Sequence, residues 1–236
     1  MAFISSLTAC TVDHPNGSLT LHFKGFYDGQ PLSMFTTKPF TTPEQLQFSQ
    51  VSFFVSDIVL LDQSAEVDVK DLELVNLSFD DPTSAIEGFT LPLGNRPAKN
   101  YTGIRFGIGV PPGLNVKKPS DFNSSNPLSN SVNYWSGWNS FIFMKIEGRI
   151  DTIGNGSFDT GFAYHTGTDP LYRTFEANLP VSIEDGKNTN IDIDIDFKKV
   201  LEGIDIKKLP LNSNPKDSIQ IGQIVQNLVN ALTLVP

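Results

Sequence analysis

One histidine of the chain has the sequence surroundings of a metal ligand. His165 ends the segment 158–165, in which Asp159, Gly161 and Ala163 alternate with aromatic residues. If this segment is a strand, His165 shares a face with these small side chains, which leave room for a ligand beside the ring. Imidazole nitrogen is a good ligand for copper and zinc. A surface or hydrogen-bonded histidine is the alternative that the sequence leaves open.

The two tryptophans lie close together in the sequence. Trp135 and Trp138 follow a polar stretch and precede the apolar run 141–144. Aromatic rings at such a boundary either line a pocket or close the end of a fold over its core. Both uses remain open at this level.

The remaining donors are scattered along the chain. His22 lies on the polar side of the alternating segment 19–24, and His14 precedes an Asn-Gly turn. His22 and Asn115 are further candidates for a metal site, because folding brings distant residues together. The chain has 3 histidines and 1 cysteine, which excludes a multi-cysteine zinc site and an intramolecular disulfide.

Three carboxylates alternate with isoleucines near the end of the chain. Asp192, Asp194 and Asp196 therefore line one face of a predicted strand. They lack the turning glycine and distal glutamate of a calcium-binding loop. A solvated strand face is also not the cleft that a pair of glycosidase carboxylates needs. We expect a charged edge strand that discourages pairing with other molecules.

The sequence does not predict an enzyme. No serine, cysteine or lysine nucleophile stands in a recognisable motif, and the histidines are too few to fill several catalytic roles. We therefore assign no catalytic residue. The formal net charge of -9 and the pI near 4.7 argue against nucleic acid as a partner, because its phosphates require a basic surface.

Short strands joined by turns account for most of the chain. Alternating or continuous apolar runs bounded by turn signals predict strands, the clearest at 19–24, 51–61, 104–110, 141–148, 158–165, 174–183 and 190–197. The run 51–61 is nearly continuously apolar, which predicts a strand covered on both faces at the centre of the fold. About eight such strands without interleaved helices are typical of an all-β antiparallel sandwich or barrel.

Two segments depart from the strand pattern. The stretch 115–133 is rich in Asn, Ser and Pro and has no periodicity, which is typical of a functional or disordered loop. After Pro215, apolar residues recur at helical spacing from Ile221 to Leu232, which predicts an amphipathic helix packed on the sheet. We therefore expect a β-sandwich domain at 11–210 and a helical segment at 211–236.

The first residues predict export. Cys10 follows an apolar opening, and Leu7-Thr8-Ala9-Cys10 resembles the lipobox at which bacterial lipoproteins are cleaved and acylated. We expect residues 1–10 to be the remnant of a lipoprotein signal. The mature chain would contact a membrane only through its lipid anchor, in the bacterial periplasm or on the outer membrane or cell surface.

Three motifs in one order resemble the MbnP-like family. They are the run VSFFVSDIVL at 51–60, the sequence FGIGVP at 106–111 followed by Asn115, and the sequence YWSGWNSFIFMKIEG at 134–148, after which YHTG follows at 164–167. The resemblance covers most of residues 18–200. The tryptophan-rich motif is the specific one.

The resemblance implies a copper site. Members of this family are exported β-rich proteins, and some bind copper through histidines and a tryptophan oxidised to kynurenine by a partner dihaem cytochrome c peroxidase-like protein. On this resemblance His165 is the retained ligand, and Trp135 or Trp138 is the residue to be oxidised. Opening an indole in this way presents an aromatic amine and a ketone where a non-ligating ring stood.

The chain departs from the copper-binding pattern at two places. Those members carry Asn-His after the GVP motif, whereas this chain has Asn115-Val116, so one histidine ligand is missing. The tryptophans are also separated by Ser136 and Gly137 instead of one residue. In a strand the extra residue sends one side chain to the other face, unless a bulge at Gly137 absorbs it. Both departures bear against copper binding.

Two functions fit these patterns. The first is a lipid-anchored envelope protein that binds copper through His165 and an oxidised tryptophan. The second is a metal-free envelope module that binds a glycan or a protein through the 115–133 loop, because aromatic faces beside it stack on sugars.

Overall fold

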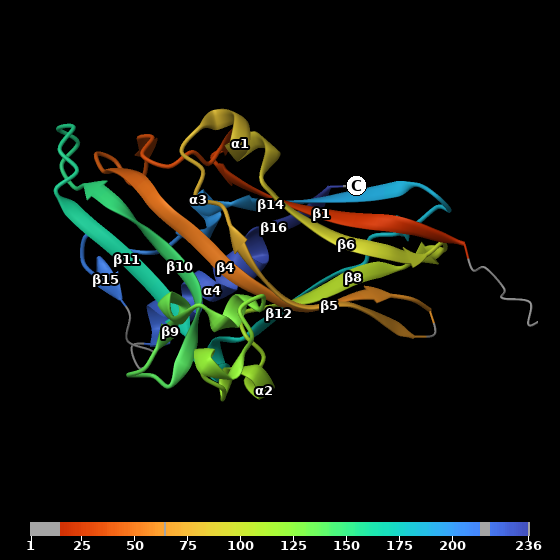
Figure 1. Cartoon of the computed structure of the whole chain (residues 1–236). Coiled ribbons are helices and arrows are strands. Elements are labelled where there is room, and N and C mark those ends of the chain that lie inside the picture. Colours follow the sequence, from red (N-terminus) through yellow and green to blue (C-terminus); the bar gives the residue numbers. More distant parts are fainter. Residues whose placement is uncertain (1–14, 64, 213–217, 236) are drawn as a thin grey trace, which may run out of the picture.

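The computed structural model describes residues 15–63, 65–212 and 218–235. Cys10 and His14 lie outside these ranges. Two β-sheets face each other across an apolar core, and the helices are few and short except at the end of the chain (Figure 1). The fold is a mostly antiparallel β-sandwich that does not close into a barrel, which confirms the predicted fold class.

The smaller main sheet is built around β1. Its five strands are β1 (Asn16–Tyr27), β2 (Gln30–Pro31), β6 (Phe89–Pro97), β14 (Asn188–Asp196) and β16 (Leu232–Val235). Leu19, Leu21 and Phe23 of β1 point into the core, as their alternation predicts. β1 pairs with β14 in parallel, whereas its pairings with β2 and β6 are antiparallel.

The larger sheet is built around β4 and β10. Its nine strands are β3 (Lys38–Pro39), β4 (Gln45–Leu61), β5 (Glu66–Asn76), β8 (Gly103–Ile108), β9 (Tyr134–Trp135), β10 (Ser140–Asp151), β11 (Thr160–Gly167), β12 (Arg173–Ala177) and β15 (Leu211–Asn212). β4 pairs with β5, β8 and β10, and its residues 51–56 are all buried, which confirms the predicted central strand. β7 (Asn100–Tyr101) and β13 (Val181–Ser182) form a separate pair.

The core between the sheets is aromatic. Phe23 of the smaller sheet meets Phe53 and Phe106 of the larger sheet edge-on, with ring centroids 6.1 and 6.0 Å away. The predicted strand 174–183 is split between two sheets, as β12 and β13. Pro180 lies between them, where it lacks the N–H that a continuous strand would donate.

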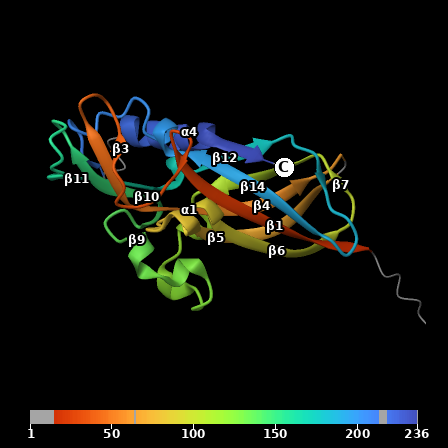
Figure 2. The ribbon, with the colours of Figure 1, turned by 90° about the horizontal axis from the view of Figure 1, so that it is seen from above.

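The polar stretch after β8 folds into a lobe, which we define as residues 112–133. It consists of α2 (Pro112–Asn115) and three 3-10 helices, η1 (Pro119–Asp121), η2 (Pro127–Ser129) and η3 (Ser131–Asn133). Leu128 is fully buried and packs with Phe54, Phe141 and Phe143 on the outer face of the larger sheet. The lobe is therefore attached to the sheet by its own small core, on the side away from α4 (Figure 2).

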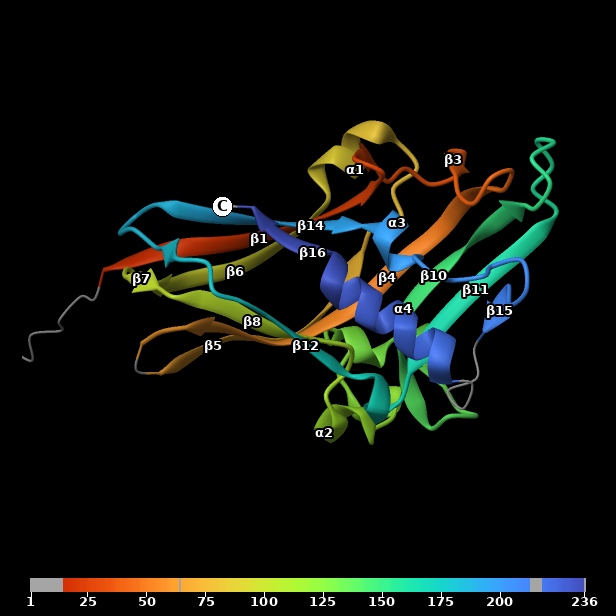
Figure 3. The same ribbon diagram turned by 180° about the vertical axis from the view of Figure 1, so that it is seen from behind.

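The predicted terminal helix is α4 (Ser218–Ala231), which lies across the back of the sandwich (Figure 3). Its buried residues are Ile221, Ile224, Val225 and Leu228, so its packing on the sheets is confirmed. Leu232, expected in the helix, instead begins β16. The other helical turns are α1 (Pro82–Glu87), α3 (Phe197–Val200) and η4 (Asp169–Leu171). None of the helices in the described ranges has the length and apolar character needed to cross a membrane.

The row of aspartates is not a sheet edge. β14 lies between β1 and β16, and Asp192 and Asp194 have strand partners on both sides. The expected edge strand is therefore wrong. The position of β14 in the sheet follows from its pairing with β1, which is more than a hundred residues away in the chain. The local alternation of residues in β14 does not indicate this pairing.

Candidate functional site

A tight turn brings the two tryptophans together before β10. Trp135 pairs with Ser140 of β10, and the Trp138 N–H donates to the Trp135 carbonyl at 3.1 Å. The indoles stack with their ring centroids 4.8 Å apart and their planes 10° from parallel. The extra residue between them does not separate the rings, because Gly137 lies in this turn and not in a strand bulge.

Two glycines, which have no side chain, let the indoles approach the backbone. A Cβ on Gly167 would lie 2.8 Å from Cζ3 of Trp138, and a Cβ on Gly137 would lie 3.0 Å from Nε1 of Trp135. Trp138 thus lies half-buried against the end of β11. Trp135 forms the outer layer of the stack and keeps 38% of its surface exposed.

His165 lies beside the outer indole. Its ring centroid is 6.3 Å from that of Trp135, with the planes at 65°. Nε2 forms a 2.7 Å hydrogen bond with Oε1 of Glu147, while Nδ1 is buried and has no hydrogen-bond partner among the described residues. A carboxylate on one ring nitrogen fixes the tautomer that leaves the lone pair on the other, as in many metal-binding histidines. The space expected around His165 is partly taken by these two side chains.

The register between β10 and β11 decides these contacts. His165 lies opposite Lys145, and Glu147 lies opposite Ala163, so His165 and Glu147 are diagonal neighbours on the outer face. Nζ of Lys145 donates to the Val132 carbonyl at 2.8 Å, which ties the lobe to the sheet beside His165. Burial lowers the pKa of Lys145, and Glu147 opposes this shift.

Asn115 holds the lobe in place. Its side chain is 5% exposed. Its Oδ1 accepts from Ser140 Oγ at 3.0 Å and from the Phe141 N–H at 2.9 Å, and its Nδ2 donates to Asp169 Oδ1 at 2.7 Å. These bonds occupy the amide, so Asn115 positions the segment before β10 and is not free to hold a metal.

A small recess opens beside the stack. It has a volume of about 260 Å³, and its lining includes Val116, Trp138, Asn139 and Thr168. Val116, one of the departures from the pattern of the resemblance, is 76% exposed. Asn139 and Thr168 have φ of 51° and 74°, a region that costs a side chain energy and is often kept at functional sites.

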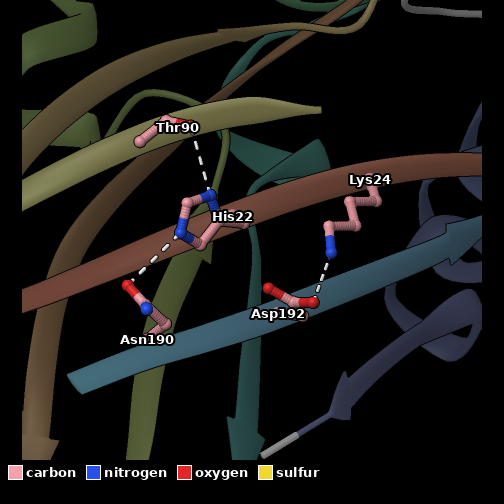
Figure 4. Close-up of polar contacts among 5 residues, drawn as sticks. All are labelled: His22, Lys24, Thr90, Asn190 and Asp192. Atoms are coloured by element: carbon pink, nitrogen blue, oxygen red, sulfur yellow. Dashed lines mark hydrogen bonds and ion pairs between the residues drawn. The ribbon is translucent and has the colours of Figure 1, made fainter. Parts of the chain in front are cut away.

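His22 is not brought to this site. It lies on β1, in the opposite sheet, with Nδ1 3.1 Å from Thr90 Oγ1 and Nε2 3.4 Å from Asn190 Oδ1 (Figure 4). The ion pair of Lys24 with Asp192 continues this row of cross-strand contacts. The sequence-predicted residues therefore separate into one cluster around His165 and the tryptophans, with Asn115 behind it, and a remote His22.

Glu147 is the residue of the candidate site that the sequence did not single out. The alternation along 141–148 predicts that Lys145 and Glu147 point outward, and they do. The available signal is the Asn155-Gly156 turn, which indicates a hairpin that would put Glu147 near His165. The pairing register could not be predicted, because the connection from Asp151 to Thr160 is longer than a two-residue turn.

Comparisons with known proteins identify the family of the chain. The model of the MbnP family matches residues 16–218. Among solved structures, MbnP from Methylosinus trichosporium is similar with a TM-score of 0.57 and 11% sequence identity, over 79% of this chain and 78% of that chain. This likeness concerns the fold alone. The search of curated proteins found no match. Because the family model spans most of the chain and includes the tryptophan turn, Glu147 and His165, the chain belongs to the MbnP family.

Proposed function

We propose that this chain is an exported, lipid-anchored protein that binds copper as its cargo at His165 and Trp135. The observation that carries the proposal is Nδ1 of His165, which has no hydrogen-bond partner in the described part of the chain, with Glu147 on the other ring nitrogen and an indole beside the ring. The association of the MbnP family with copper supports the choice of metal.

The encoded residues supply only part of a copper site. His165 offers one nitrogen donor, and Glu147 orients it. No group of three or more His, Cys, Asp or Glu side chains within the described ranges is placed to hold a metal. A modified residue can supply further donors. Conversion of Trp135 to kynurenine would add an amine and a ketone next to His165.

That conversion requires an external oxidant. The indole C2–C3 bond is cleaved as the ring takes up two oxygen atoms, and hydrolysis of the resulting formyl group then releases formate. The family resemblance is the ground on which we propose a dihaem cytochrome c peroxidase-like protein as the partner. Two molecules of hydrogen peroxide used by it would supply the two oxygen atoms and leave two molecules of water. Trp135 is the preferred target because it is the exposed ring of the stack and the one nearest to His165.

The envelope location rests on Cys10. The lipobox-like sequence that ends there predicts acylation, which attaches the chain to a membrane and brings it to the compartment of an exported peroxidase. Intact-mass measurement of protein from the native host, compared with Cys10→Ala, tests this step. A lipid-sized mass that is present only with the cysteine supports it, and an unmodified wild-type cysteine contradicts it.

Copper stoichiometry and affinity test the site itself. Metal-free protein from the native host is titrated with copper as wild type, as His165→Ala and as His22→Ala. We expect His165→Ala to lose tight binding and His22→Ala to keep it, because His22 lies on the opposite sheet. Peptide mass spectrometry of the same sample reports whether Trp135 or Trp138 is oxidised. Wild-type protein that binds no copper above background would contradict the proposal.

A second candidate is a metal-free module that binds a glycan or a protein. The observation that favours it is the exposed indole of Trp135, together with two exposed valines of the lobe, Val116 and Val132, which are 76% and 64% exposed. Deleting the lobe is a poor test, because Leu128 covers buried phenylalanines and the sheet would lose this cover. Trp135→Ala on a glycan array, with Val235→Ala as a distant exposed control, is sharper. Binding that both variants retain would dispose of this alternative.

A further inference from the structure

A cavity lies at the end of the sandwich where β1 finishes, away from the tryptophan stack. Its volume is about 810 Å³, and it forms where the β1–β2 turn, the β3–β4 turn and the segment after α3 meet. Its floor is apolar, since Tyr27, Leu201 and Ile204 are only 1%, 1% and 4% exposed, and Phe40 is partly buried beside them. Cavities of this size and lining hold small organic ligands.

The rim of this cavity carries a negative charge. Five carboxylates and two lysines line it, a net charge of -3. One lysine is already engaged, because Lys198 forms a 2.9 Å ion pair with Asp28. Glu202 is exposed on the rim, and Glu44 is half-buried there. The negative potential reaches the floor, where burial raises the pKa of Tyr27 and the nearby carboxylates raise it further.

A second recess continues the cavity along the end of β14. It has a volume of about 330 Å³ and shares Asp196 and Lys199 with the first, and it adds Asp194. Burial raises the pKa of Asp194, Lys24 opposes the shift and Asp192 adds to it. A cation that approaches such a carboxyl group stabilises its charged form, so the interaction between the two is favourable.

We propose that this groove binds an organic ammonium cation with an aliphatic body. The ammonium groups would lie at the rim carboxylates, and the carbon chain would lie along the floor, where the ring of Phe40 is partly exposed and available for a cation–π contact. Anionic ligands are disfavoured by the same charges. A free aliphatic polyamine and the lysine side chains of a peptide share this chemistry. The site is independent of the copper proposal.

Calorimetric titration of the full chain tests the groove. The probes are spermidine, a lysine-rich hexapeptide and an uncharged aliphatic diol of similar length, each at low and at high ionic strength. The test variant is Glu44→Gln/Glu202→Gln. The control is Glu184→Gln, which also removes a surface carboxylate but lies by Gly17, at the other end of β1. That is about 30 Å away along the strand. At this distance salt screens the charge of Glu184 from the groove.

We expect spermidine, the peptide or both to bind, with an affinity that falls at high ionic strength, and the diol not to bind. The double variant should weaken binding about tenfold and the control less than about twofold. Binding of only one charged probe identifies the source of the ammonium group. The proposal is overturned if neither charged probe binds, if the diol binds as well as they do, or if test and control variants behave alike while both retain the wild-type circular dichroism spectrum.

Discussion

Replacing Asn115 with alanine tests how the lobe is held to the sandwich. The wild-type amide accepts from the Phe141 N–H and the Ser140 hydroxyl and donates to Asp169. In the variant the Phe141 N–H, which is buried, loses this acceptor. The Ser140 hydroxyl keeps a partner, because its one proton can turn to the Phe141 carbonyl, which lies 2.9 Å from Oγ. Asp169 is exposed, so water can solvate it.

The expected loss of stability follows from the contacts that the variant loses. An unsatisfied buried N–H costs about 1–3 kcal/mol, and the small void left by the amide adds about 1 kcal/mol. The expected loss in the free energy of unfolding is therefore about 2–4 kcal/mol. For a chain of this length that lowers Tm by about 4–16 °C.

Urea and thermal unfolding of Asn115→Ala and Val116→Ala measure this loss. Val116 is the adjacent residue and is 76% exposed, so its truncation should change stability by less than about 0.5 kcal/mol. A loss below about 0.5 kcal/mol for Asn115→Ala, or an equal loss for both variants, would refute the structural role of the amide.

Three further predictions concern the site and its surroundings. Gly167→Ala places a methyl group against Trp138, so we expect a loss of about 1–3 kcal/mol in unfolding free energy and a change in the near-UV circular dichroism of the stacked indoles; an unchanged spectrum would contradict the packing. Val116→His places an imidazole at the recess beside Trp138 and should tighten copper binding by more than about tenfold; a titration without any gain would contradict a copper site that reaches this recess. Burial raises the pKa of Tyr172 from 10.0 to about 12, so the unfolded chain loses this proton first and stability should fall as pH rises between these values. Tyrosinate absorbance of Tyr172→Phe should lack a component that titrates near pH 12, and loss of a component near pH 10 instead counts against the shift.

The local patterns predicted several elements correctly, for identifiable reasons. The run 51–61 carries its own signal, because a strand buried on both faces has few polar residues. The outward positions of Lys145 and Glu147 follow from period-two alternation, and the α4 face follows from helical spacing. Each of these patterns depends on residues within one element.

The errors arise where distant segments meet. The alternating aspartates of β14 predict an edge strand, although pairing with β1 and β16 places this strand inside a sheet. The polar stretch 115–133 has no periodicity, yet Leu128 and the Asn115 amide fix it to the sheet. The sequence of a short apolar segment does not indicate which surface of the fold it will cover.

The candidate site shows the same division. The sequence by itself determined which side chains are available for chemistry: one histidine on an outward face, two neighbouring tryptophans, and valine where a second histidine would stand. Only the tertiary structure decided that the indoles stack, that Trp135 lies against His165, and that Glu147 takes Nε2 while Nδ1 has no partner among the residues that the structure describes. The physical reason is that residue type and periodicity are local, whereas turn geometry and strand register depend on long-range packing.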